Sequence, residues 1–179
     1  GYFGRIAAIE YAMRHDDGQA LDDLEGADVV LVGVSRTSKT PTCVYLAHRG
    51  IKAANVPIVT EASLLDGLAK LQRPLIVGLT INADQLAHIR RTRQRMLGLE
   101  QGDSNQFGGD YADLERIRGE LVLARRLFAR HQWPELDVTK RSVEETAAAI
   151  YQMVQARQQP ELKALAAVLP GAGWSGDGA

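Results

Sequence analysis

The most informative stretch of the sequence reads Asp28-Val-Val-Leu-Val-Gly33-Val-Ser-Arg-Thr-Ser-Lys-Thr40-Pro41. Its first part is apolar and rich in β-branched residues, which is typical of a strand buried on both faces of a parallel sheet. Pro41 falls in the first turn of an expected helix, where its missing N–H does no damage. The stretch therefore predicts a buried strand, a polar loop and a helix in succession.

Apolar runs and helical patterns alternate on both sides of this stretch. Further strands are expected over residues 54–59, 74–81 and 133–138. Helices are expected over residues 3–15, 42–49, 63–70, 111–131 and 142–158, with another that begins at Asn82 or Asp84 and ends near residue 96. The polar, glycine-rich residues 98–109 predict a mobile loop. Such alternation predicts an α/β fold with a parallel sheet and helices on both faces.

Composition limits the classes of protein to which the chain belongs. Its 179 residues are about one domain long, with 45% hydrophobic and 24% charged residues, as in an ordinary globular chain. A net charge of -1 gives no bulk attraction to nucleic acid or anionic lipid, and the longest apolar run, residues 29–34, is too short to span a bilayer. The single cysteine excludes an intrachain disulfide and a cysteine-based zinc cluster. Neither nucleic acid nor a membrane is expected as a partner.

The loop after the strand has the spacing of a phosphate-binding loop (P-loop), G-x-x-x-x-G-K-[ST], with Ser38 in place of the second glycine. In this context backbone N–H groups and the helix N-terminus can surround phosphate oxygens, and Lys39 adds a positive charge. Thr40 is the candidate Mg²⁺ ligand. The expected fold is therefore a P-loop kinase-like sheet. The candidate nucleotide-binding residues are Gly33, Val34, Ser35, Arg36, Thr37, Ser38, Lys39 and Thr40.

The same loop carries a family resemblance, which extends to other segments of the chain. The sequence resembles the pyruvate, phosphate dikinase regulatory protein family, whose sister branch regulates phosphoenolpyruvate synthase. The similarity covers most of residues 5–157, and Ser-Lys-Thr at 38–40 favours the dikinase branch. The segments that carry it are Arg5-Ile-Ala-Ala-Ile-Glu-Tyr11, His15-Asp-Asp-Gly18, Gly33 to Thr42, Ala54-Asn-Val-Pro57, Val77-Gly-Leu-Thr-Ile81 and Asp137-Val-Thr-Lys-Arg-Ser-Val-Glu-Glu-Thr146.

The resemblance implies a bifunctional regulator of pyruvate, phosphate dikinase. Such an enzyme transfers phosphate from ADP to a threonine of the dikinase, and removes it with inorganic phosphate to release pyrophosphate. ADP and Mg²⁺ are then the expected cofactors, and the dikinase is the expected protein partner. The resemblance also implies an N-terminal domain that this sequence lacks. The single cysteine fits a reducing setting, so a cytoplasmic location is expected, bacterial or, as an alternative, in a chloroplast. A homodimer is an open alternative. Residues 1–158 are expected to form the catalytic P-loop domain and residues 159–179 a disordered tail.

Candidate catalytic residues follow from that chemistry. Lys39 and Arg36 are the cations expected to contact the transferred phosphoryl group. Asp16 and Asp17 are the carboxylates available to accept the threonine proton if the fold brings their turn over the loop, and the resemblance favours Asp17. Neighbouring His15 either orients a carboxylate or lies in a surface turn.

Other residues have a structural interpretation beside a functional one. The arginines at 90, 91 and 93 form either a lid over the phosphates or, more in keeping with their spacing, a solvated helix face. Asp137 is favoured as a strand-end residue bonded to its own turn over a nucleotide-side role, and Cys43 as a small packed side chain over a nucleophile. Three alternatives to the dikinase regulator stay open: a synthase regulator, an ATP-dependent kinase of small metabolites, and a nucleotide-binding fragment without turnover.

Overall fold

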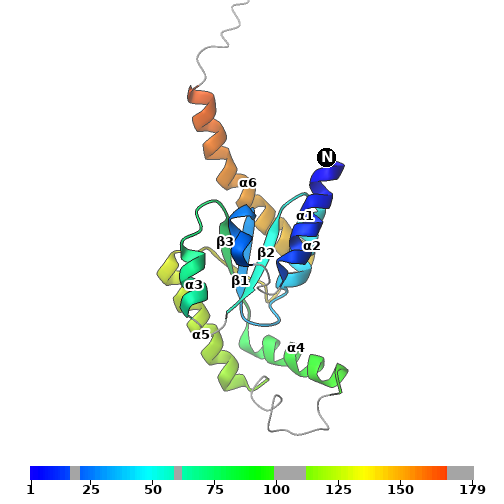
Figure 1. The fold of residues 1–179 in the computed structure, drawn as a ribbon. Coiled ribbons are helices and arrows are strands. Elements are labelled where there is room, and N and C mark those ends of the chain that lie inside the picture. The colour runs from blue at the N-terminus through cyan, green and yellow to red at the C-terminus, as the bar shows by residue number, and fades with distance from the viewer. Residues whose placement is uncertain (17–20, 59–61, 99–111, 169–179) are drawn as a thin grey trace, which may run out of the picture.

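A four-stranded parallel sheet lies at the centre of the molecule (Figure 1). The computed structural model describes residues 1–16, 21–58, 62–98 and 112–168. The strands are β1 (Val29–Gly33), β2 (Ala53–Pro57), β3 (Leu75–Thr80) and β4 (Glu135–Asp137), in the order β2-β1-β3-β4, and every neighbouring pair is parallel. The predicted α/β class with a parallel sheet is confirmed.

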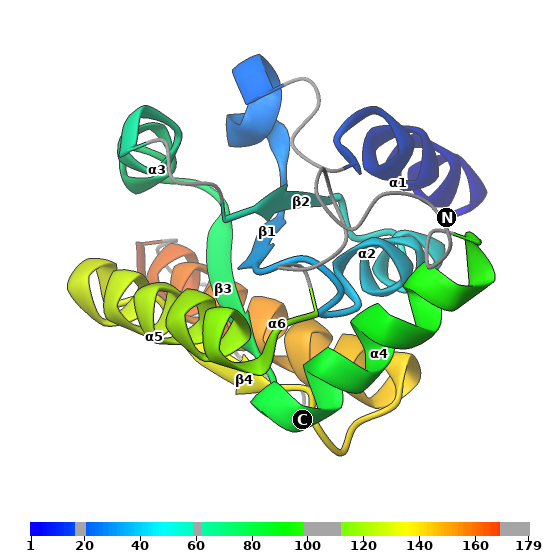
Figure 2. The same cartoon turned by 90° about the horizontal axis from the view of Figure 1, so that it is seen from below.

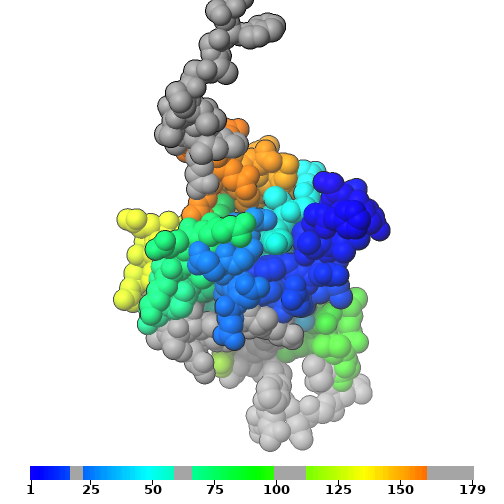
Figure 3. Space-filling model, turned by 45° about the horizontal axis from the view of Figure 1, so that its top comes forward, coloured from blue at the N-terminus to red at the C-terminus, as the bar shows by residue number. Residues whose placement is uncertain are grey.

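Helices cover both faces of the sheet. The helical elements are α1 (Tyr2–Arg14), the 3₁₀ helix η2 (Leu21–Gly26), α2 (Lys39–His48), α3 (Ala62–Ala69), α4 (Ala83–Met96), α5 (Leu114–His131) and α6 (Val143–Val168). Figure 2 shows α2 and α6 on one face, with α3 and α5 on the other. α1 packs against α2 and the edge strand β2, and in the space-filling view α3, η2 and α1 follow one another along one side of the molecule (Figure 3).

The hydrophobic core forms on both sides of β1, whose five residues are all buried. α5 packs unusually close to β3, the strand beside β1, at Gly78. A Cβ atom at this position would lie 2.5 Å from the ring of Phe128, so only glycine allows the helix to approach. The sheet is therefore fixed between two helical layers, and the carboxyl ends of its strands meet at one edge. α4 lies across that edge (Figures 1 and 2).

The helix boundaries differ from expectation mainly at the C-terminus. α6 continues to Val168, so the predicted end near residue 158 is wrong, and residues 159–168 of the expected disordered tail are helical. Pro160 lies inside the helix. Residues 155–160 are exposed, so water can bond the carbonyl that the proline leaves without an N–H partner. The tail residues 169–179 lie outside the described residues.

Two more differences concern the connections between elements. Residues 21–26, over which no helix was expected, form η2, and α5 begins at Leu114, capped by Asp113, although residue 111 was the expected start. Asn82 is the cap of α4, since its side chain accepts hydrogen bonds from the N–H groups of Asp84 and Gln85. The expected loop at 98–109 falls almost entirely outside the described residues. No helix in the described ranges is both long and apolar enough to cross a bilayer.

Candidate functional site

The P-loop begins where β1 ends, at Gly33. A Cβ atom here would lie 2.8 Å from Oγ1 of Thr37 and 3.2 Å from the carbonyl oxygen of Leu79 on the neighbouring strand. The loop folds back so tightly that only glycine fits at its first position. The first glycine of the motif is therefore required by the packing of the loop against the sheet.

Two side chains brace the loop from inside. The hydroxyl of Thr37 donates a hydrogen bond of 2.9 Å to the carbonyl oxygen of Val34, and the ammonium of Lys39 donates one of 2.7 Å to the same atom. The Lys39 ammonium also lies 3.4 Å from Oγ1 of Thr37. Only 5% of Lys39 is exposed, so its charge is held at the loop and not in bulk water. A charge fixed in this way interacts strongly with an anion placed beside it.

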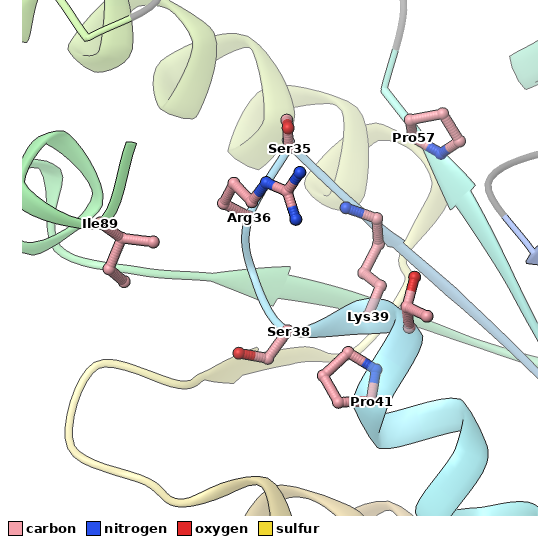
Figure 4. A pocket seen from close by; sticks show the side chains of 8 residues that line it. Ser35, Arg36, Ser38, Lys39, Pro41, Pro57 and Ile89 are labelled. Carbon is pink, nitrogen blue, oxygen red and sulfur yellow. The ribbon is translucent and has the colours of Figure 1, made fainter. Parts of the chain in front are cut away.

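The backbone explains how serine replaces the second glycine of the motif. Ser38 has φ 62° and ψ 26°, the left-handed conformation that glycine adopts without penalty. Figure 4 shows the Ser38 side chain pointing away from the Lys39 ammonium. The serine side chain therefore does not block the space beside the Lys39 ammonium. Replacing the glycine by serine adds backbone strain instead of a steric clash with a phosphate.

A pocket of about 440 Å³ opens over the loop. In Figure 4 the guanidinium of Arg36 and the ammonium of Lys39 point toward one another. None of the described residues that line the pocket is acidic, so an anion between the two cations would relieve their mutual repulsion. Its lining residues are Ser35, Arg36, Ser38, Lys39, Thr40, Pro41, Pro57 and Ile89. Of the predicted set, Gly33, Val34 and Thr37 are buried beneath this surface.

The turn after α1 lies at the same loop. Oδ1 of Asp16 accepts a hydrogen bond of 2.7 Å from the Thr40 hydroxyl and another of 2.7 Å from the side-chain amide of Asn55 on β2. The expectation that the fold brings this turn to the loop is therefore confirmed for Asp16. Asp17, the favoured candidate base, lies outside the described residues, and its role stays a prediction.

Comparison with models of protein families shows the family to which the chain belongs. Residues 1–151 match the family model described as kinase/pyrophosphorylase. The chain belongs to the kinase/pyrophosphorylase family. The match includes the P-loop, Asp16 and Asn55, so the residues that the structure brings together at the pocket all lie within the region that defines the family.

Individual relatives agree with this kinase/pyrophosphorylase membership. A protein of Caulobacter vibrioides is 53% identical over 153 residues, which are 86% of this chain and 47% of that protein. One of Sinorhizobium medicae is 56% identical over 149 residues, 83% of this chain and 53% of its own length. Both names assign these proteins provisionally as pyruvate, phosphate dikinase regulatory proteins. The chain spans about half the length of the curated relatives that it matches.

The buried arginine of α4 corrects a prediction about this kinase/pyrophosphorylase domain. Arg90 is 1% exposed, donates a hydrogen bond of 3.2 Å to the carbonyl oxygen of Ser35 and forms a 2.8 Å ion pair with Glu120 on α5. It is thus neither a lid over the phosphates nor part of a solvated face. Arg91 and Arg93 are exposed, as expected of a solvated helix face. The difference arises because α4 turns only one of these positions toward the loop.

Three further candidates have structural roles in this kinase/pyrophosphorylase domain. Oδ1 of Asp137 accepts bonds of 2.5 Å and 2.9 Å from the hydroxyl and N–H of Thr139, and the hydroxyl bond in particular lowers the pKa of Asp137. His15 is buried, and its Nδ1 lies 2.8 Å from the carbonyl oxygen of Tyr11, so the surface-turn interpretation is wrong. Burial raises the pKa of the Cys43 thiol to about 12, as befits packing and not nucleophilic attack.

Sequence reasoning missed two residues at or beside the P-loop site. Asn55 was noted only as part of a family segment, although an amide in an otherwise apolar buried strand is a signal that a polar partner lies nearby. Ile89 lines the pocket from α4, and no local pattern places a helix residue opposite a loop more than fifty positions earlier. Such contacts follow from the path of the chain in space.

Proposed function

We propose that this chain provides the nucleotide-binding and phosphoryl-transfer site of an ADP-dependent protein threonine kinase that also acts as a phosphate-dependent pyrophosphorylase. The protein substrate is a pyruvate, phosphate dikinase. The observation that carries the proposal is the P-loop pocket, into which Arg36 and Lys39 bring two positive charges. None of the described residues that line it has a carboxylate. Membership of the kinase/pyrophosphorylase family and the names of the relatives support the choice of reaction and target.

The two reactions balance with one phosphate site. In the forward direction the threonine oxygen attacks the β-phosphorus of ADP, the bond to the bridging oxygen breaks, AMP leaves and a base accepts the threonine proton. In the reverse direction an oxygen of inorganic phosphate attacks the phosphorus of the phosphothreonine, the bond from phosphorus to the threonine oxygen breaks, and that oxygen takes up a proton while pyrophosphate forms. In both, Lys39 and Arg36 contact the phosphoryl oxygens, where charge redistributes. The β-phosphate of ADP and pyrophosphate thus occupy the same loop.

The residues also fit a magnesium ion bound together with the phosphates. Mg²⁺ prefers oxygen ligands and commonly takes one or two protein groups, with phosphates and water completing its coordination. Thr40 presents a hydroxyl at the first turn of α2, and among the described residues no group of three or more His, Cys, Asp or Glu side chains lies together to hold a metal alone. When bound, the ion would neutralise phosphate charge. Thr40 is its proposed protein ligand.

A second candidate, nucleotide binding without turnover, follows from one specific observation. The chain corresponds to about half of each relative, for example 47% of the Caulobacter protein. Docking of a protein substrate generally needs a larger surface than the phosphate site, and that surface can reside in the other half. In that case the pocket binds Mg²⁺–ADP and phosphate does not reach the dikinase threonine.

The test measures binding and transfer with the same protein. Calorimetric titration with ADP, ATP and pyrophosphate, each with Mg²⁺, is compared between the wild type and Lys39→Ala. Hydrogen bonds to charged groups contribute about 1.5–3 kcal/mol, so Lys39→Ala should weaken ADP and pyrophosphate binding by about tenfold or more. Phosphate transfer from ADP labelled at the β-position to purified dikinase is then followed in the same samples.

The exposed lysine that follows α3 supplies the matched control, since Lys70→Ala removes the same charge where the chain leads into β3, at the opposite edge of the parallel sheet from the loop. It should leave both measurements unchanged. Productive transfer from ATP and not from ADP would identify a different kind of kinase. Binding without transfer would select the second candidate, and the absence of any nucleotide or pyrophosphate binding to the wild type would refute both.

A further inference from the structure

The carboxylate of Asp16 is held beside the P-loop from two sides. It follows the C-terminal end of α1, and its Oδ1 receives the Thr40 hydroxyl from α2 and the Asn55 amide from β2, each at 2.7 Å. Asn55 is 1% exposed, and its backbone N–H donates to the carbonyl oxygen of His15 at 3.3 Å. The edge strand therefore holds both the backbone and the side chain of this turn in place beside the loop.

This arrangement fixes the direction of the Thr40 hydroxyl. A hydroxyl has one proton and two lone pairs, and the proton of Thr40 is donated to Asp16. The lone pairs are then left for another partner, and a hard cation bound with phosphates accepts such ligands. A carboxylate bonded to a metal ligand orients that ligand and raises the affinity of the site. The geometry thus supplies both an oriented ligand and a negative charge behind it.

No other carboxylate at the described strand ends is available for this role. Asp137, which ends β4, is bonded through Oδ1 to the hydroxyl and N–H of Thr139. β3 is followed by Ile81 and Asn82, and the side chain of Asn82 caps α4. Asp16 is instead bonded directly to the hydroxyl of the proposed metal ligand, Thr40.

From this geometry we infer that Asp16 is the residue that organises the magnesium site, by orienting the Thr40 hydroxyl and supplying the protein's negative charge to the ion. The inference rests on the proposed function, because the cation binds together with the phosphates of ADP or pyrophosphate. It gives Asp16 a role in metal binding that differs from the proton transfer expected of a neighbouring base. Asp16 is a positioning residue in this scheme, since it acts through Thr40.

The test measures how much Mg²⁺ strengthens ADP binding. Calorimetric titrations with ADP are run in Mg²⁺ and in EDTA for the wild type, Asp16→Asn and the control Asp22→Asn, which removes an exposed carboxylate from η2. Loss of a group behind a metal ligand typically lowers metal affinity about 10–100-fold, so Asp16→Asn should lose about tenfold or more of the Mg²⁺-dependent gain. In EDTA its affinity should be unchanged or higher, because a negative charge near the phosphates is gone.

The exposed Thr40 provides variants that test the same link without disturbing the core. Thr40→Val should lose the Mg²⁺-dependent gain, Thr40→Ser should keep it, and Asp16→Asn combined with Thr40→Val should be no worse than Thr40→Val alone. An unaltered Mg²⁺ gain in Asp16→Asn with slower phosphate transfer would overturn the inference and leave Asp16 as a base. If the wild type binds ADP in neither condition, the proposed function fails together with it.

Discussion

Two residues of the loop adopt a backbone conformation that their side chains disfavour. Arg36 has φ 69° and Ser38 has φ 62°, and both lie in the loop that binds the proposed phosphates. A left-handed conformation costs about 1–2 kcal/mol for a residue with a Cβ atom. The bonds from Thr37 and Lys39 to the Val34 carbonyl hold the loop in this shape. The candidate phosphate-binding residues and the strained backbone conformations therefore occur at the same positions of the loop.

The first prediction concerns Ser38→Gly, which restores the usual motif. Relief of the left-handed strain should outweigh the extra flexibility of glycine in the unfolded chain, so stability to urea should rise by up to about 1 kcal/mol. Pyrophosphate binding should be retained, because the serine side chain points away from the Lys39 ammonium. The β-branched control Ser38→Val should lower stability by more than about 1 kcal/mol. Loss of pyrophosphate binding in Ser38→Gly would show that the hydroxyl contacts the ligand.

At the scale of elements, α4 and α5 connect the loop to the rest of the molecule. Arg90 reaches from α4 to the Ser35 carbonyl and to Glu120 on α5, and Ile89 beside it lines the pocket. One helix thus contributes both a wall of the pocket and an anchor for the loop backbone. The arginines at neighbouring positions face solvent and take no part in this contact.

The second prediction compares two arginines of the same helix. Arg90 is buried while the Glu120 side chain is 36% exposed, so Arg90→Met, which removes hydrogen bonds of a charged group, should be destabilised by about 1.5–3 kcal/mol in thermal unfolding. Arg93→Met changes an exposed side chain and should stay within about 0.5 kcal/mol of the wild type. Glu120→Gln keeps a hydrogen-bond acceptor but removes the negative charge that pairs with the buried guanidinium, so it should also lower stability. Equal stability of the two arginine variants would contradict the anchoring role.

At the scale of the whole molecule, the single cysteine reports on the integrity of the fold. Cys43 lies on α2 and is 2% exposed, packed in the core cluster that includes β1 and β2. Burial raises the pKa of its thiol to about 12 from an ordinary value of 9.0. The folded state therefore retains this proton at pH values where the unfolded chain has lost it.

The third prediction is a fall in stability at alkaline pH. Between pH 9 and 12 the unfolded chain binds fewer protons at this thiol, so the stability contributed by the neutral thiol is complete below pH 9 and is lost as the pH rises. The slope approaches about 1.4 kcal/mol per pH unit. Urea unfolding at pH 8, 9 and 10 should show a smaller loss in Cys43→Ala. The same loss in both proteins would assign the effect to other groups, such as Tyr11, whose pKa is also raised to about 12.

The order of elements, the parallel sheet and the place of the P-loop could all be predicted from the amino-acid sequence. These features depend on local chemistry: the apolar run of β1, the glycine that ends it, and Lys39 and Thr40 at the start of α2. The family relationship was also predicted from these segments and is confirmed by the match over residues 1–151. Short-range patterns carry such information because the pattern of a buried strand and the shape of a loop depend on residues only a few positions apart.

The distant residues that complete the site become visible only once the chain is folded. Thr40 and Asn55 are bonded to Asp16 from positions 24 and 39 residues away, and Arg90 contacts Ser35 across 55 residues. The same packing buries Arg90, while the arginines beside it stay exposed, and it places His15 in the interior. Hydrogen bonds and burial of this kind depend on where the helices pack against the sheet. The spacing of residues along the sequence does not show which of them this packing brings together.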